Sequence, residues 1–128
     1  MSLKDLKIEA TESTPYISCK GNEGVIEFKG RSIPENATSF YTPVIDWLEE
    51  YGKTPGNQTM LEFYMEYINS ISQKIILDIL YRVEDLKKQN GNQVNVVWRY
   101  EKDDEEMEDE GRLFASKVDL DFEMISEN

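Results

Sequence analysis

The sequence has no histidine and only one cysteine, Cys19, which limits the kinds of catalytic and metal site that it can form. A chain without histidine lacks the usual general base near neutral pH and cannot form Ser–His or Cys–His nucleophile pairs. One thiol and no imidazole are also too few ligands for a zinc or iron–sulfur site. A single cysteine cannot form an internal disulfide, which is typical of a reducing compartment. We therefore expect no catalytic residue, no bound metal and no cofactor.

Basic residues and long apolar runs are scarce as well. The chain has 14 Lys and Arg residues against 26 Asp and Glu residues, so its formal net charge is −12. An acidic surface repels nucleic-acid phosphates and anionic lipids, so we expect neither nucleic acid nor a membrane as a partner. Residues 1–7 lack the apolar core of a secretion signal, and no run approaches the length of a membrane span. These features predict a cytoplasmic protein whose protein partners present basic residues.

Enough apolar residues are present to bury a core. Of the 128 residues, 39% are hydrophobic, which predicts one domain over residues 1–128. Strands are indicated where apolar and polar residues alternate, in segments 16–20, 25–29, 61–67, 94–101 and 120–124. Helical spacing of apolar residues predicts helices over about 39–52 and 71–89, with Asn90-Gly91 as a stop signal. Because Pro43 has no N–H, we expect the first helix to begin late or to bend there.

Each predicted strand has one apolar face and one largely polar face. Strands covered by helices on both sides would read as continuous apolar runs, so we expect the helices mainly on one face of the sheet. The Gly-rich stretch 21–24 predicts an antiparallel hairpin at the start, and Cys19 falls on its inward face. The later alternation of strands and helices favours right-handed parallel crossovers. The expected fold class is therefore α/β (α+β), a single domain with a mixed sheet.

Ser70 lies where the strand over 61–67 changes into the helix over 71–89. Gln73 follows three residues later, which is the spacing of a capping box, so we interpret Ser70 as the helix N-cap. A hydroxyl at this position is exposed and close to backbone N–H groups that the helix does not use. A phosphate there would accept hydrogen bonds from these groups, with Lys74 close by. Ser70 is thus a candidate phosphorylation site, and Ser72 is the alternative acceptor.

Two other groups of residues leave alternatives open. The acidic segment 103–110 lacks the glycine and the ligand spacing of a calcium loop, and it suits the solvated start of a helix. Whether it binds cations or a basic partner stays open. Carboxylate chemistry also remains possible, so a small enzyme or ligand-binding domain that uses Glu62, Glu66 and Arg99 is an alternative function. Its mark would be a deep pocket lined by those side chains.

Three segments of the chain resemble the SiaC-type regulatory phosphoproteins of bacteria. Residues 30–36 read Gly-Arg-Ser-Ile-Pro-Glu-Asn, similar to the family's Gly-x-Ser-x-Pro-Glu-Asn signature, and Phe40-Tyr41, Pro43 and Trp47-Leu48 follow as in its aromatic helix. Residues 67–70, Tyr-Ile-Asn-Ser, are similar to the segment that carries the family's phosphorylated hydroxyl. Residues 98–105 resemble its strand before an acidic helix. The resemblance covers nearly the whole chain.

This resemblance implies a STAS-like fold, akin to that of anti-anti-sigma factors, and a non-catalytic signalling switch. It implies a serine/threonine kinase, a PP2C-like phosphatase and an effector such as a diguanylate cyclase as partners, with cyclic-di-GMP and biofilm behaviour as the output. Carried over by position, Ser70 is the phosphoacceptor. Asn69 stands where anti-anti-sigma factors usually have aspartate, and Ile71 replaces their small residue, so an anti-anti-sigma factor is the weaker alternative.

We expect the switch on the rim of the sheet rather than on its polar face. This partner-binding rim is predicted to consist of Asn69, Lys74, Pro34, Glu35 and Asn36 around Ser70. The direction of the switch and the oligomeric state do not follow from the sequence.

Overall fold

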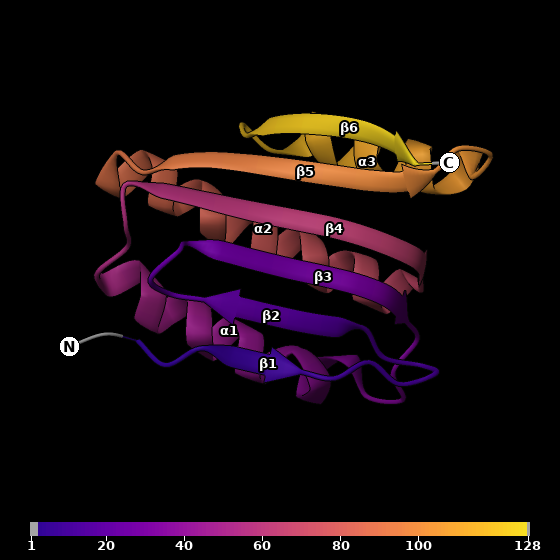
Figure 1. The fold of residues 1–128 in the computed structure, drawn as a ribbon, viewed down its shortest axis with the longest axis horizontal. Helices are drawn as coiled ribbons and strands as arrows, with labels where there is room; N and C mark the ends of the chain where they lie inside the picture. The colour runs from indigo at the N-terminus through magenta and orange to yellow at the C-terminus, as the bar shows by residue number, and fades with distance from the viewer. Residues whose placement is uncertain (1–2, 128) are drawn as a thin grey trace.

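The strands form one six-stranded sheet whose spatial order follows the order of the chain, β1-β2-β3-β4-β5-β6 (Figure 1). The structure is a computed structural model, and it describes residues 3–127. The strands are β1 (Leu6–Ile8), β2 (Tyr16–Lys20), β3 (Val25–Ser32), β4 (Gln58–Ile68), β5 (Gln93–Glu101) and β6 (Asp121–Glu127). The short strand β1 was not expected from the sequence, because three residues are too few to show an alternation.

The sheet is antiparallel at its start and parallel thereafter. The pairs β1–β2 and β2–β3 are antiparallel, whereas β3–β4, β4–β5 and β5–β6 are parallel. The turn between β2 and β3 closes on Gly24, whose φ of 68° lies in the left-handed region that favours glycine. A Cβ on Gly24 would lie 2.3 Å from the Gln58 carbonyl oxygen, so the residue must also be small. The predicted mixed sheet with an initial hairpin is confirmed.

Helices α1 (Ala37–Lys53), α2 (Ser70–Asn90) and α3 (Glu105–Lys117) connect the parallel strands and lie together behind the sheet in Figure 1. Each crossover leads to the next strand in the same direction along the sheet. A right-handed crossover that always moves in one direction puts its helix on the same face every time. The expectation of helices on one face is therefore confirmed, and the opposite face stays open.

The core lies between that sheet face and the helices. Fully buried apolar residues of the strands include Ile17 and Cys19 on β2, Leu61 and Phe63 on β4, and Trp98 on β5. Burial raises the pKa of the Cys19 thiol to about 12, so this thiol stays protonated and acts as a small packing residue. Within the described residues no helix is long and apolar enough to cross a membrane.

The first helix begins earlier than Pro43 led us to expect. Helix α1 starts at Ala37, and the side chain of Asn36 caps it by accepting a hydrogen bond of 3.1 Å from the Ser39 N–H. Both Ala37 and Tyr41 are buried against the core. The cap and this burial outweigh the single backbone hydrogen bond that Pro43 cannot donate.

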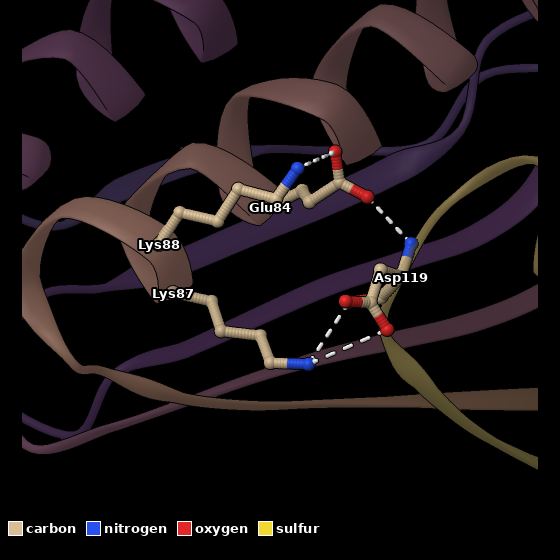
Figure 2. Close-up of polar contacts among 4 residues, drawn as sticks. All are labelled: Glu84, Lys87, Lys88 and Asp119. Carbon is tan, nitrogen blue, oxygen red and sulfur yellow. Dashed lines mark hydrogen bonds and ion pairs between the residues drawn. The ribbon is translucent and has the colours of Figure 1, made fainter.

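The C-terminal end of α2 is fixed to the connection between α3 and β6 (Figure 2). The Glu84 carboxylate accepts a hydrogen bond from the Asp119 N–H, and the Lys87 ammonium donates to the Asp119 carbonyl oxygen at 3.0 Å. The Lys88 ammonium also lies 3.5 Å from the Glu84 carboxylate. Gly91, with a φ of 66°, ends the helix as predicted. These contacts hold the C-terminal part of α2 against the connection between α3 and β6.

Candidate functional site

Ser70 is the first residue of α2, directly after the N-cap Asn69, and its side chain is exposed. The Asn69 side chain accepts a hydrogen bond of 2.9 Å from the Ser72 N–H, and its carbonyl accepts the first helical bond from Gln73. The capping box that we expected between Ser70 and Gln73 is thus wrong, because the chain turns into the helix one residue earlier. The correction leaves the Ser70 hydroxyl outside the cap.

The first turn of α2 itself suits an anion. The N–H groups of the first turn point out of the helix without an acceptor inside it, and the helix dipole makes this end positive. Helix α2 has no acidic residue in its first turn, whereas α3 has Glu105, Glu106 and Glu108 there. Lys74 is exposed one turn after Ser70, at the spacing that brings two helical side chains together. A phosphate on Ser70 would therefore meet N–H groups, a positive dipole end and an ammonium group.

Buried hydroxyl groups hold the first turn of α2 to the sheet. Ser32, at the end of β3, donates from Oγ to the Ser72 Oγ at 2.8 Å, and its carbonyl accepts from the Asn69 N–H at 2.9 Å. Since the single proton of Ser32 goes to Ser72, the Tyr41 hydroxyl must donate to the Ser32 Oγ, at 2.7 Å. All three hydroxyl-bearing residues are fully buried. This hydroxyl cluster of Ser32, Tyr41 and Ser72 joins β3, α1 and α2.

The cluster also decides between the two candidate acceptors. Ser72 has no exposed surface, and its hydroxyl already accepts a hydrogen bond from Ser32. A modifying enzyme would have to open the first turn of α2 to reach it. The folded structure therefore offers Ser70, not Ser72, to such an enzyme. Burial is also the main cause that raises the pKa of Tyr41, so its phenol keeps the proton that the cluster requires.

The other predicted rim residues lie at neighbouring strand ends. Ser32 pairs with Ile68 in the parallel register, so the connection after β3 and the start of α2 leave the sheet at the same edge. Pro34 and Asn69 are partly buried there, and Glu35, Asn36 and Lys74 are exposed. The buried hydroxyl cluster was not predicted from the sequence. Ser32 and Tyr41 were quoted only as parts of a motif, because no local pattern indicates a hydrogen bond between distant residues.

The residues of the alternative ligand site lie on the open sheet face, and they are already paired. Arg99 binds Glu62 at 2.5 Å and Glu127 at 2.8 Å. These residues line an open hollow of about 250 Å³, to which Glu66 does not contribute. A guanidinium between two carboxylates is neutralised and has little affinity left for an anionic substrate. This geometry does not form the deep pocket that an enzyme of this kind would need.

Other polar groups of the open face are also engaged with each other. The Tyr64 hydroxyl donates to the Glu101 carboxylate, and this hydrogen bond is the main cause that raises the pKa of Tyr64 to about 12. Among residues 3–127, no group of three or more His, Cys, Asp and Glu side chains is placed to hold a metal ion. The acidic segment forms the start of α3, with Asp104 as N-cap accepting from the Met107 N–H at 3.0 Å.

Known proteins are similar to this chain over nearly its whole length. A family model described as SiaC family regulatory phosphoprotein matches residues 8–127. The chain is 30% identical over 120 residues to an uncharacterised protein of Pseudomonas aeruginosa strain UCBPP-PA14, and this match covers 94% of each sequence.

Solved structures from the same organism are similar in three dimensions. Apo-SiaC from Pseudomonas aeruginosa superposes with a TM-score of 0.84 at 27% identity, covering 95% of this chain and 98% of that one. A chain in the complex of the diguanylate cyclase SiaD with its activator SiaC, also from Pseudomonas aeruginosa, gives a TM-score of 0.90 at 28% identity. That match covers 96% of this chain and 100% of the other.

Proposed function

Because the chain belongs to the SiaC family of regulatory phosphoproteins, we propose that it is a signalling switch whose partner binding is controlled by reversible phosphorylation of Ser70. The observation that carries this proposal is the position of the Ser70 hydroxyl. It is exposed at the start of a helix whose first turn has no acidic residue and is fixed from behind by the hydroxyl cluster. A phosphate adds about two negative charges and three acceptor oxygens at such a place.

The fold can accept this charge without rearrangement. Free N–H groups at a helix start and a lysine at the next turn stabilise an anion. The energetic effect of phosphorylation on folding is then small, and its main effect is on the surface that a partner meets. A phospho-switch needs this combination, because the same folded state has to present two different surfaces.

The proposed effector is a diguanylate cyclase. The similar protein SiaC from Pseudomonas aeruginosa is described as the activator of the diguanylate cyclase SiaD and was crystallised in complex with it. We extend this role to the present chain, with cyclic-di-GMP signalling as its output. A cognate serine/threonine kinase and a PP2C-like phosphatase would add and remove the phosphate. The rim around Ser70, which includes Asn69, Lys74 and residues 34–36, is the proposed contact surface.

Mass spectrometry of the protein from its native cells tests the modification. Trypsin releases residues 54–74 as one peptide, because no Lys or Arg lies between Lys53 and Lys74. This peptide contains both Ser70 and Ser72, so fragment ions must assign the phosphate. We expect it on Ser70. Phosphate on Ser72 alone would contradict the proposal, since it would require an opened first turn.

Charge variants test the switch itself. Ser70→Asp and Ser70→Ala should bind the diguanylate cyclase of the same organism with affinities that differ by tenfold or more, as measured by calorimetry. Asn22→Asp is the matched control, because Asn22 is exposed in the turn at the opposite end of β3 and gives the same change in net charge. Equal affinities for Ser70→Ala and Ser70→Asp, or an equal effect of Asn22→Asp, would refute the mechanism.

A further inference from the structure

A groove separates the first turn of α2 and the end of β4 from α3. Its volume is about 430 Å³, and its lining includes Tyr67, Gln73, Met107 and Leu113. It lies at the same sheet edge as Ser70, since Tyr67 precedes Ser70 by three residues and Gln73 follows it by three. We call it the acidic groove, because five carboxylates line it.

The groove is bordered by large apolar side chains that the fold leaves exposed. Tyr67 is 47% exposed and Leu113 is 50% exposed, and both line it. Ile71, next to Ser70 but outside the lining of the groove, is 56% exposed. Met107 and Ile68 are buried beneath and give the groove an apolar floor. A gathering of exposed apolar side chains at one place, unlike scattered single ones, marks an interaction surface.

The charged residues of the groove are all of one sign. Its lining includes no Lys or Arg. It includes five carboxylates, those of Glu66, Asp104, Glu106, Asp109 and Glu110. Within residues 3–127, none of the five takes part in an ion pair. The hollow on the open sheet face differs, because there Lys29 and Arg99 offset two of the three carboxylate charges. The Glu110 Oε1 is in addition buried without any hydrogen-bond partner.

We propose that the acidic groove is the docking site for a segment of a partner protein that carries Lys or Arg beside apolar side chains. Such an amphipathic segment places its apolar face on Tyr67 and Leu113, and its cations meet the unpaired carboxylates. Complementary charge of this kind steers association and selects the partner. The inference deepens the proposed function, on which it rests, because it assigns a surface and a partner chemistry beside the Ser70 switch.

A peptide titration tests the groove directly. The probe is a synthetic amphipathic helix of Lys and Leu, added to the ¹⁵N-labelled full chain, with a Glu and Leu peptide of the same pattern as control. The largest chemical-shift changes are expected at residues 66–68, Gln73 and residues 104–113. Changes spread evenly over the surface, or centred on the open sheet face, would overturn the proposal.

Matched double variants separate the groove from the general effect of net charge. Glu66→Gln with Asp109→Asn removes one carboxylate from each wall, and both side chains are exposed. We expect the affinity for the Lys and Leu peptide to fall about five- to tenfold, in line with two partly exposed ion pairs. Glu12→Gln with Asp46→Asn changes the net charge equally at exposed sites outside the groove and should change it less than twofold.

The same variants, measured against the diguanylate cyclase, distinguish the two proposals. If both double variants weaken peptide binding equally, the groove is not a specific site and the inference fails. If Ser70→Asp controls cyclase binding while the groove variants leave it unchanged, the switch stands and the docking site falls. If the groove variants weaken cyclase binding while Ser70→Ala and Ser70→Asp behave alike, the docking site stands and the switch falls.

Discussion

Because Asn69 and not Ser70 caps α2, we predict that substitutions at these two neighbouring residues change the stability of the protein differently. The Asn69 side chain accepts the Ser72 N–H at 2.9 Å, whereas Ser70 occupies the first helical position. Asn69→Ala removes this acceptor but keeps the backbone bond from the Asn69 N–H to the Ser32 carbonyl. Ser70→Ala removes only an exposed hydroxyl. The two neighbouring substitutions should therefore differ in their effect on stability.

The magnitudes follow from the role of each side chain. Replacing an Asn cap by Ala costs about 0.5–2 kcal/mol, typically about 1 kcal/mol. Ser70→Ala costs nothing comparable, because Ala has a higher helix propensity than Ser, by a few tenths of a kcal/mol. With a urea m value of about 2 kcal/mol/M, the Asn69→Ala midpoint should fall by about 0.5 M. The Ser70→Ala midpoint should stay unchanged or rise slightly.

Urea unfolding followed by far-UV circular dichroism measures both effects. Asn69→Asp should restore most of the lost stability, since Asp caps a helix as well as Asn does. Asn36→Ala at the start of α1 is a positive control with an equivalent cap bond of 3.1 Å. If Ser70→Ala lowers the midpoint as much as Asn69→Ala does, the cap has been assigned to the wrong residue. The account of a free Ser70 hydroxyl would then be refuted.

Three further predictions concern the interior. Ser72→Ala leaves the buried Ser32 hydroxyl without its acceptor, so the free energy of unfolding should fall by about 1–3 kcal/mol. Urea unfolding measures this change, and an unchanged stability would contradict the hydroxyl cluster. Gly111→Ala would place a Cβ 2.4 Å from the buried Trp98 ring. Ala favours the helix by about 1 kcal/mol over Gly, but the overpacking costs about 1–3 kcal/mol, so we expect a net loss of stability. The displaced Trp98 ring should also change the near-UV circular dichroism. Burial, the main cause, raises the pKa of Glu110 above its ordinary value, so its deprotonation disfavours the folded state as pH rises through that pKa. Glu110→Gln should therefore raise the melting temperature at pH 7, and this gain should shrink as the pH falls below about 4.5; a gain that is independent of pH would contradict the assignment.

Much of the fold follows from local patterns, because each strand had to hide one face. The alternation predicted the buried side of β4 over residues 61–65, and Asn90-Gly91 predicted the end of α2. Tyr67, the next residue in that alternation, is 47% exposed, because the register with β3 shifts between Met65 and Tyr67. Pro43 misled the prediction of where α1 begins, since the penalty for one missing hydrogen bond is visible in the sequence and the burial that offsets it is not. The capping role of Ser70 was misplaced for a similar reason, because a one-residue shift in where a helix begins leaves the hydrophobic pattern almost unchanged.

The sequence by itself determined the class of the fold and the junction at which a hydroxyl meets a helix start, because periodicity and cap chemistry act between near neighbours. Only the tertiary structure decided which hydroxyl faces the solvent. Ser70 and Ser72 are two residues apart, which places them on opposite sides of a helix. The hydrogen bond from Ser32, which is itself bonded to Tyr41, turns Ser72 inward. Those partners lie 40 and 31 residues away in the chain, so no local pattern records the contact, and packing alone leaves Ser70 outside.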